Sequence, residues 1–334
     1  MALTARGSIS RRHYPRSPLG LTELSLGCAQ LGNLYRAIGD DESHATVDAA
    51  WERGIRYFDT APHYGLGLSE RRLGVALAGR PRDEYVVSTK VGRLLEPVAH
   101  VSGRDDEGFD VPASHRRVWD FSRDGILRSL ESSLERLGLD RVDLVFLHDP
   151  DDHWTDALRY AYPALEELRA EGVVSGIGAG MNQTAMLAEF ARHTDMDTFM
   201  LAGRYTLLEQ GALDELLPLC EERGIGVVAA GVFNSGLLAR DTPASSDHYD
   251  YGEAPPAIVD RARLIAELCV SAGTTLPAAA IAFPLAHPAV VSVCLGARSP
   301  AQVERNASLY EAGVPPGLWP ALRDRGVLRG RAPT

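Results

Sequence analysis

The feature that most constrains this chain of 334 residues is a regular alternation between two kinds of segment. Short runs rich in Val, Ile, Leu and Tyr, typical of buried strands, alternate with longer stretches that have the apolar spacing of a helix. The alternation predicts eight strands, at 24–29, 56–59, 85–89, 142–147, 173–178, 198–201, 226–230 and 290–295. It predicts a helix after each strand, at 42–53, 69–78, 122–137, 155–171, 183–193, 212–223, 256–272 and 300–310, and one more helix at 276–286.

Helix end signals support this alternation. In SRDGILRSLESSLERLGLDRVD, Ser122 stands where an N-cap is expected, leucines recur at helical spacing, and Gly138 follows the last of them. Eight strand–helix units in a chain of this length favour an α/β fold of the (β/α)8 TIM barrel type, with 1–334 as a single domain. The alternative is a doubly wound dinucleotide-binding sheet, whose GxGxxG motif follows the first strand. The nearest match here, SGIGAGMN, lies mid-chain, and its third glycine comes one residue early.

The composition of the chain argues against several classes of binding partner. The formal net charge of −11 argues against nucleic acid or an anionic membrane surface, and no apolar run is long enough for a membrane span. Cys28, Cys220, Cys269 and Cys294 have no metal-binding spacing, so we expect free thiols in the cytoplasm and no metal site. The oligomeric state stays open, a homo-oligomer included.

Three segments fall outside the alternation. Residues 1–17 are rich in arginine and lack acidic residues; we interpret them as a short N-terminal arm, with an organelle-targeting peptide as the alternative. Residues 92–120 and 240–255 are long and irregular. In a barrel, long loops that follow strands form the rim where substrates bind, so we expect both to be rim loops, with a plain surface insertion as the alternative for the second.

Chemistry-bearing side chains follow several of the predicted strands. Lys90, in VVSTKVG, is the only lysine among the 34 basic residues and stands at a strand end. Asp59 is the last residue of its predicted strand, His148 lies just past the end of its own, and Tyr64 lies five residues beyond Asp59. Because the carboxyl ends of all barrel strands open onto one face, we expect these four side chains to converge there.

Such a set suits proton transfer by a tyrosine. A phenol with a free pKa of about 10 is a weak acid and base at neutral pH. A neighbouring ammonium, Lys90, would favour the phenolate and lower the pKa of Tyr64, and Asp59 would hold that ammonium in place. His148 would orient a substrate oxygen or share the proton transfer. The competing interpretations are that Asp59 caps a turn, that His148 is a buried core histidine and that Tyr64 only packs. A further alternative is that Lys90 forms a Schiff base with substrate, as in a lyase.

At these residues the chain resembles the aldo-keto reductase superfamily. The matching stretches are GIRYFDTAPHYGLGLSERRLGVAL, VVSTKVG, LERLGLDRVDLVFLHDPDD and CLGARSPAQVERN, and the resemblance extends over nearly the full length. It implies a (β/α)8 barrel that binds NAD(P)H without a separate dinucleotide domain. It also implies that Asp59, Tyr64, Lys90 and His148 are the catalytic tetrad for hydride transfer between nicotinamide and a carbonyl or alcohol. Some members are nicotinamide-binding subunits without catalysis, so a redox sensor is kept as a second hypothesis.

Finer segments are similar to one branch of that superfamily. LAGRYTLLEQGAL and GVFNSGLLA look like the bacterial dehydrogenases of D-threo-aldoses and L-fucose, and they are also similar to pyridoxal 4-dehydrogenase. The implied substrate is a small sugar or aldehyde, and the implied reaction oxidises the C1 hemiacetal of a small aldose to a lactone. The alternatives are pyridoxal oxidation and general reduction of aldehydes and ketones.

The resemblance also implies where ligands bind. Asn182 stands beside the position of the usual nicotinamide amide ligand. Gln302 occupies the place of an arginine that many members direct at the 2′-phosphate of NADP, which favours NAD over NADP. The expected cofactor residues are Asn182, Tyr205, Phe233, Asn234, Gly236, Leu237, Gly296, Arg298, Ser299, Gln302 and Asn306. The expected substrate-pocket residues are His63, Trp119, Phe121, Tyr205 and Phe233, with Asp149 and His153 near the mouth of the pocket.

Overall fold

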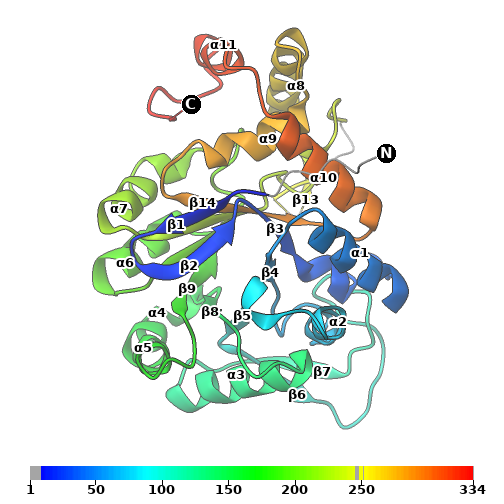
Figure 1. Cartoon of the computed structure of the whole chain (residues 1–334), viewed down its shortest axis with the longest axis vertical. Helices are drawn as coiled ribbons and strands as arrows, with labels where there is room; N and C mark the ends of the chain where they lie inside the picture. Colours follow the sequence, from blue (N-terminus) through cyan, green and yellow to red (C-terminus); the bar gives the residue numbers. More distant parts are fainter. Residues whose placement is uncertain (1–8, 245–247, 251, 334) are drawn as a thin grey trace.

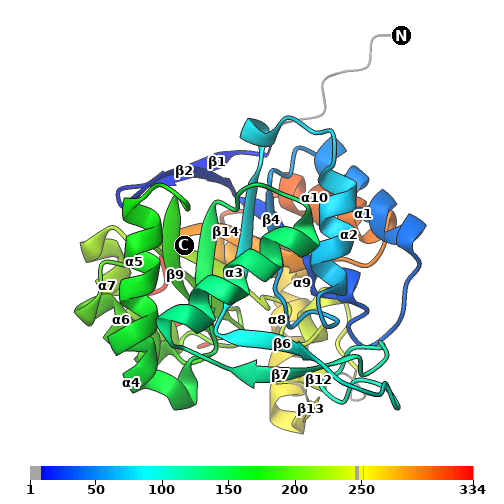
Figure 2. The same ribbon diagram turned by 90° about the horizontal axis from the view of Figure 1, so that it is seen from below.

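Eight parallel strands close into a barrel in the computed structural model, which describes residues 9–244, 248–250 and 252–333 (Figures 1 and 2). Around the barrel each strand pairs with the next in the order β3, β4, β5, β8, β9, β10, β11 and β14, and β14 returns to β3. Their bounds are β3 Leu24–Gly27, β4 Tyr57–Asp59, β5 Val86–Val91, β8 Leu144–His148, β9 Gly176–Met181, β10 Thr198–Ala202, β11 Gly226–Ala230 and β14 Val290–Gly296. The predicted (β/α)8 TIM barrel is confirmed.

Helices surround the strands (Figure 1). Their bounds are α1 Asp40–Glu52, α2 Leu68–Leu77, α3 Arg123–Leu137, α4 Trp154–Asp156, α5 Tyr162–Ala170, α6 Thr184–His193, α7 Leu216–Arg223, α8 Pro256–Ser271, α9 Leu276–Leu285, α10 Pro300–Ala312 and α11 Leu318–Asp324. Neighbours in this ring pack together: α1 contacts α2 and α10, α3 contacts α2 and α5, and α6 contacts α7. Ser122 caps α3 by accepting a hydrogen bond from the Gly125 N–H, as predicted.

Some elements differ from the predicted ones. The helix expected at 155–171 is divided into α4, a π-helical stretch Ala157–Ala161 and α5. The one expected at 212–223 begins with a 3-10 turn, Gly211–Leu213, before α7, and α11 was not predicted. Among the described residues no single helix has the length and apolar character of a membrane span; only α8 and α9 together, bent by 94° at their junction, pass that test.

The inside of the barrel explains the glycine run in β9. Gly176, Gly178 and Gly180 face inward, where a Cβ on Gly178 would lie 1.7 Å from the Thr198 carbonyl oxygen and 3.1 Å from the Phe146 ring. The small residues of β9 therefore leave room for the large side chains that the two neighbouring strands, β8 and β10, direct into the barrel, Phe146 and Met200. The run is a feature of barrel packing and not a phosphate-binding turn.

The amino-terminal segment is built into the fold. β1, Arg11–Tyr14, pairs antiparallel with β2, Ser17–Thr22. Tyr14 and Leu21 belong to the apolar cluster inside the barrel, and the Tyr14 hydroxyl lies 2.6 Å from Thr198 Oγ1. The prediction of an arm at 1–17 is therefore wrong for 11–17, because apolar side chains of this hairpin pack into the barrel; residues 1–8 lie outside the described residues.

Both long loops contain antiparallel strands. In 92–120, β6, Arg93–Pro97, pairs with β7, His115–Trp119. In 240–255, β12, His248–Tyr249, pairs with β13, Gly252–Glu253, while 245–247 and 251 lie outside the described residues. The pairing of Arg93 with Trp119 returns the first loop to the end of β5, and so keeps it beside the carboxyl end of the barrel.

Candidate active site

The four predicted catalytic side chains lie together at the carboxyl end of the barrel. Asp59 is the last residue of β4, Lys90 is the last but one of β5, and His148 ends β8; their exposed fractions are 2%, 2% and 6%. Tyr64 reaches the same point from the loop between β4 and α2. That loop passes close to the chain at Gly32, since a Cβ on Gly65, whose φ is +62°, would lie 2.2 Å from the Gly32 carbonyl oxygen.

Lys90 is the centre of this group. Its ammonium donates to Asp59 Oδ2 at 2.7 Å, to the Thr60 carbonyl at 3.1 Å and to the Tyr64 hydroxyl at 3.1 Å. These three acceptors use all three N–H groups of the buried ammonium. Ser88 Oγ donates to the other oxygen of Asp59 at 2.7 Å, which holds the carboxylate in position. The compact, rotatable ammonium suits three acceptors in different directions better than the planar fork of an arginine would.

The pKa of Tyr64 departs from the sequence-based expectation. Burial raises it above the ordinary value of 10, although the charge and hydrogen bond of Lys90 act to lower it, as predicted. The desolvation of the phenolate outweighs the ammonium, so Tyr64 is a protonated phenol at neutral pH. For Lys90, burial lowers the pKa, but Asp59 and Tyr64 more than compensate, and its pKa is raised above 10.5.

His148 is a neutral imidazole. Burial lowers its pKa well below 6.5, and the cations of Arg93 and Lys90 lower it further. Its ring centroid lies 6.1 Å from that of Tyr64 and 5.5 Å from that of His63. Its buried Nδ1 has no hydrogen-bond partner among the described residues, so the ring can still form a hydrogen bond with a ligand. The geometry suits an imidazole that orients a substrate oxygen beside the Tyr64 hydroxyl.

The predicted substrate-pocket residues lie around this group. The His63 Nδ1 accepts a hydrogen bond from Arg117 Nε at 2.6 Å, and burial, Arg93 and Arg117 lower its pKa to about 2. The rings of Trp119 and Phe121 are stacked at 6.0 Å with an interplanar angle of 18°. His153 lies 5.3 Å from Trp119 and 5.1 Å from Phe121 between ring centroids. Asp149, next to His148, forms an ion pair with Arg93.

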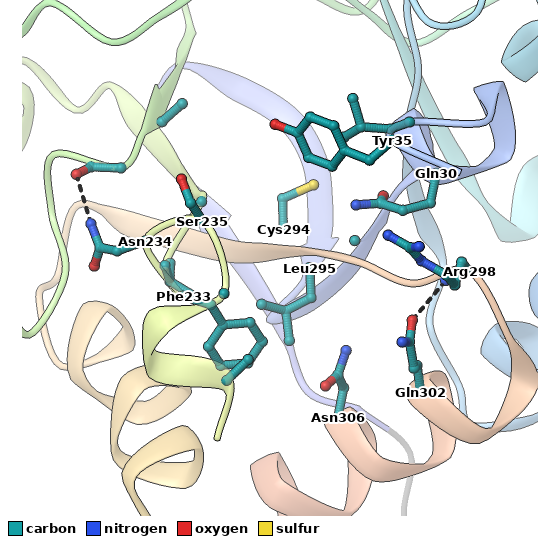
Figure 3. Close-up of a pocket in the computed structure, with 18 of the residues that line it drawn as sticks. Gln30, Tyr35, Phe233, Asn234, Ser235, Cys294, Leu295, Arg298, Gln302 and Asn306 are labelled. Carbon is teal, nitrogen blue, oxygen red and sulfur yellow. Dashed lines mark hydrogen bonds between the residues drawn. The ribbon is translucent and has the colours of Figure 1, made fainter. Parts of the chain in front are cut away.

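A cavity of about 400 Å³ opens between the ends of β9, β10, β11 and β14 and the start of α10 (Figure 3). Cys294, on its wall, is close enough to Asp59 and Lys90 for both charges to act on its pKa, so the cavity adjoins the tetrad. In Figure 3, Tyr35 and Phe233 lie on opposite sides of it. The predicted cofactor residues that line it are Asn182, Phe233, Asn234, Gly236, Gly296, Arg298, Gln302 and Asn306.

These residues fit a nicotinamide dinucleotide. Among the described residues, the buried Oδ1 of Asn234 and Oε1 of Gln30 have no hydrogen-bond partner, and both side chains line the cavity. Such atoms are suited to amide and ribose groups of a ligand. At the other end, Arg298 and the amino terminus of α10, capped by Ser299, offer positive charge and N–H groups for phosphate.

Three predicted cofactor residues do not line this cavity. Tyr205 is 1% exposed and packs against Phe283 at 5.1 Å and His287 at 5.9 Å, so its ring is part of the core. Leu237 is fully buried in the main apolar cluster. Ser299 serves as the α10 cap, where its side chain accepts from the Gln302 N–H. Tyr205 therefore does not line this cavity, and its contact with a ligand stays a prediction.

The cavity also contains residues that the sequence did not indicate. Gln30, Tyr35, Arg204, Asp250 and Arg305 line it, and Arg204 forms an ion pair with Asp250 at 2.9 Å. Asp250 lies in the turn between β12 and β13, so this pair holds the second rim loop beside the cavity. Tyr35 has a φ of +60°, a left-handed backbone conformation that the surrounding sequence does not predict.

Comparisons with known proteins agree with this geometry. The Aldo/keto reductase family matches residues 23–316. A D-threo-aldose 1-dehydrogenase of Pseudomonas sp. is 52% identical over 93% of this chain and 95% of its own length. A pyridoxal 4-dehydrogenase of Microbacterium luteolum is 38% identical over 95% and 98%. The holo form of aldo-keto reductase AKR11C1 from Bacillus halodurans has a TM-score of 0.75 and 28% identity over 96% and 97% of the two chains.

The family match, the barrel and the four converging side chains all indicate an oxidoreductase. Hydride transfer with a nicotinamide cofactor is the general chemistry of such proteins, and the cavity beside the tetrad has a suitable lining. The chain is an oxidoreductase that belongs to the aldo/keto reductase family.

Proposed function

We propose that this enzyme oxidises the C1 hemiacetal of a small aldose, of the L-fucose or D-threo-aldose type, to a lactone. The observation that carries the proposal is the contact of Lys90 Nζ with both Asp59 and the Tyr64 hydroxyl, beside a neutral His148. The 52% identity to a D-threo-aldose 1-dehydrogenase supports the choice of substrate. The polar side chains around the tetrad, His63, Arg93 and Asp149, are suited to a substrate with several hydroxyls.

The residues divide the work as follows. Tyr64, in its phenolate form, accepts the proton of the anomeric hydroxyl, and the ammonium of Lys90, 3.1 Å from its oxygen, stabilises that phenolate before the transfer. Asp59 holds Lys90 charged and in place. His148 orients the anomeric oxygen through its imidazole. A nicotinamide held in the cavity would accept the hydride from C1; loss of that hydride, and of the hydroxyl proton to Tyr64, would convert the cyclic hemiacetal to a ring ester.

Gln302 supports a preference for NAD. Its neutral amide stands at the start of α10, and its Oε1 accepts a hydrogen bond from the Arg298 backbone N–H at 2.9 Å. A 2′-phosphate there would meet less positive charge than an arginine at this position would supply. We expect a higher kcat/KM with NAD than with NADP, and Gln302→Arg should shift the ratio towards NADP. A ratio that Gln302→Arg leaves unchanged would contradict this part of the proposal.

The test of the reaction is formation of reduced nicotinamide from L-fucose, with pyridoxal as the second substrate and Tyr64→Phe as the matched variant. Turnover of L-fucose that Tyr64→Phe abolishes, with cofactor binding retained, supports the proposal. Turnover of pyridoxal alone would favour the second candidate, which rests on the 38% identity to pyridoxal 4-dehydrogenase. Reduction of simple aldehydes without either oxidation would leave a general reductase, and cofactor binding without any turnover would favour a redox sensor.

The four cysteines, all free and buried, support the proposed cytoplasmic location.

A further inference from the structure

We propose that Arg93 and Asp149 form a hydroxyl-recognition pair, which selects polyhydroxylated substrates over plain hemiacetals at the tetrad. The inference rests on the proposed function and deepens it by naming the chemical class that the site reads. Both residues follow neighbouring barrel strands: Arg93, the first residue of β6, lies three residues beyond Lys90 of β5, and Asp149 directly follows His148, the last residue of β8. Each charged residue therefore stands farther out from the barrel than the member of the tetrad that precedes it.

The pair lies at the reacting centre. The Asp149 Oδ2 is 3.6 Å from the Nε2 of His148 and also contacts the Arg93 guanidinium. The Arg93 guanidinium carbon stands 4.2 Å above the centre of the Trp119 ring. Trp119, which is 41% exposed, adds an aromatic ring next to the two charges. A sugar ring presents the same combination, with apolar C–H faces and hydroxyls at its edge.

Two observations indicate that the pair is built for a ligand. The Arg93 side chain is only 11% exposed, yet its buried Nε has no hydrogen-bond partner among the described residues. An unmade hydrogen bond on a buried cation is costly, and a ligand oxygen would supply the missing acceptor. Asp149 remains 33% exposed, so its carboxylate is accessible from solvent.

The backbone of Asp149 is also strained in a way that fixes its carboxylate. Its φ is +40°, in the left-handed region that side-chain-bearing residues seldom adopt, and its N–H donates to the Gly180 carbonyl at 3.0 Å. Strain of this kind costs about 1–3 kcal/mol and clusters at functional sites. Here it turns the residue after His148 towards Arg93 rather than away from the site.

The neighbouring arginine shows what a purely structural role looks like. Arg117 is 7% exposed, and it donates to Asp105 at 2.6 Å and to His63 Nδ1 at 2.6 Å. Asp105 is 3% exposed, so the ion pair of Arg117 with Asp105 is closed to solvent and holds the 92–120 loop together. Arg93 and Asp149 differ from it in having an unused donor and an accessible carboxylate.

The charges of the pair define the ligand class. A carboxylate beside a guanidinium offers an acceptor and donors side by side, which matches vicinal hydroxyls, since each hydroxyl both donates and accepts. The pair is neutral as a unit, so it gives no net attraction to a phosphate or a carboxylate. A neutral polyol is the substrate that satisfies both members.

The experiment compares two cyclic hemiacetals, L-fucose and 2-hydroxytetrahydropyran, which has the same reacting carbon but no other hydroxyl. The quantity measured is the ratio of their kcat/KM values in the wild type, Arg93→Met, Asp149→Asn and the double variant. We expect the wild type to prefer the sugar and each single variant to lower the ratio about 10- to 150-fold, the range for a hydrogen bond to a charged group. The loss should appear mainly in KM for the sugar, and the double variant should lose less than the product of the two singles.

Arg123→Met is the matched control, because it removes an exposed ion pair with Glu167 on the outer helices and should leave the ratio unchanged. A ratio that stays within about threefold of wild type in both single variants would overturn the inference. So would an equal loss on both substrates, since that outcome places the pair in support of His148 and not in hydroxyl recognition. Asp149→Asn preserves the size of the side chain and provides the answer if Arg93→Met does not fold. A wild type that oxidises 2-hydroxytetrahydropyran with no preference for the sugar refutes the pair alone, whereas turnover of neither refutes the proposed function as well.

Discussion

Asp59→Asn is the substitution that most directly tests how the site is held together. Asp59 is the carboxylate partner of the Lys90 ammonium at 2.7 Å, and both side chains are 3% exposed. Asparagine has nearly the same shape, and its Oδ1 still accepts from Ser88, which now donates at 2.7 Å. The substitution therefore removes one negative charge and little else, and it leaves the ammonium buried without a counter-charge.

The expected cost is large. Breaking a buried ion pair by removing one partner destabilises a protein by about 3–5 kcal/mol, because the remaining charge is desolvated without compensation. Two acceptors of Lys90 remain, the Thr60 carbonyl and the Tyr64 hydroxyl, both at 3.1 Å. They solvate the ammonium in part, so we expect a loss near the lower limit, about 3 kcal/mol at pH 7. Lys90→Met combined with Asp59→Asn removes both charges and should recover most of that loss.

The pH dependence of this loss carries the sharper test. In the wild type the pKa of Lys90 is raised above 10.5, so its stabilising contribution is fully present below pH 10.5 and is lost only as pH rises through the higher, folded-state value. In Asp59→Asn, burial is no longer opposed by the carboxylate, and the folded-state pKa should fall below 10.5. Between those two pKa values the unfolded chain binds more protons, so the stability of the variant rises with pH.

The assay is urea unfolding of wild type, Asp59→Asn and the double variant at pH 7 and pH 9.5. If the folded-state pKa of Lys90 in the variant lies about 2–3 units below the unfolded value of 10.5, the deficit of Asp59→Asn should shrink by about 1.5–2.5 kcal/mol between these pH values. The double variant, which has no lysine to titrate, should show a deficit independent of pH. A single variant with the same deficit at both pH values, or a double variant as unstable as the single one, would refute the assignment of a desolvated ammonium.

Three further outcomes are expected. Because burial raises the pKa of Tyr64, oxidative kcat/KM should rise about tenfold per pH unit from pH 7 to pH 9, as the phenolate becomes more populated. Tyr64→Phe should lose this slope and reduce the rate about 10²- to 10⁴-fold, whereas a flat wild-type profile would contradict the role of the phenol. Gly178→Ala should lower the free energy of unfolding in urea by about 3 kcal/mol or more, since its Cβ would lie 1.7 Å from the Thr198 carbonyl oxygen. Gly180→Ala, whose nearest contact is at 3.5 Å, should fold normally, and equal losses of stability in the two variants would refute the packing argument for β9. Arg298→Ala should raise the Kd for NAD about 10- to 150-fold in a fluorescence titration without changing the melting temperature, and unchanged binding would exclude Arg298 from the cofactor site.

The barrel could be predicted because its information is periodic. Each barrel strand overlaps a predicted apolar run, and each predicted helix overlaps an observed one. The largest error in a strand is at β9, predicted at 173–178 and observed at Gly176–Met181. The prediction followed Val173 and Val174, whereas glycines have low strand propensity. Glycines are needed here because the Thr198 carbonyl and the Phe146 ring of the neighbouring strands fill the space that a Cβ would take. A requirement imposed by another strand cannot be read from the local sequence.

The amino-terminal hairpin was missed for a related reason. β1 and β2 are short, and β1 exposes most of its arginine-rich face, so the local composition resembles a tail. Its stabilising contacts are distant ones: Tyr14 reaches Thr198 in β10, and Leu21 lies in the cluster inside the barrel. Only the closed barrel creates the apolar interior into which those two side chains pack.

The site shows how composition decides which residues can be noticed. Lys90 stands out because it is the only lysine, and Asp59 and His148 because each ends a strand. Arg93 occupies an equally informative position, three residues beyond Lys90, but it is one of 33 arginines and so carries no signal of its own. Its importance rests on the distance to Trp119 and on a buried Nε without a partner, and neither property has a sequence pattern.

The pKa of Tyr64 marks the limit of sequence reasoning most clearly. The residues correctly indicate that an ammonium lies near the phenol, and Lys90 does act to lower its pKa. The net direction depends on a competition between that charge and the desolvation of the phenolate, and desolvation depends on how completely the surrounding side chains exclude water. Lys90 also shares its charge with Asp59, which by itself raises the pKa of Tyr64. The same carboxylate that keeps the lysine charged therefore weakens its effect on the phenol, so the tetrad holds a proton on Tyr64 until another positive charge or a higher pH removes it.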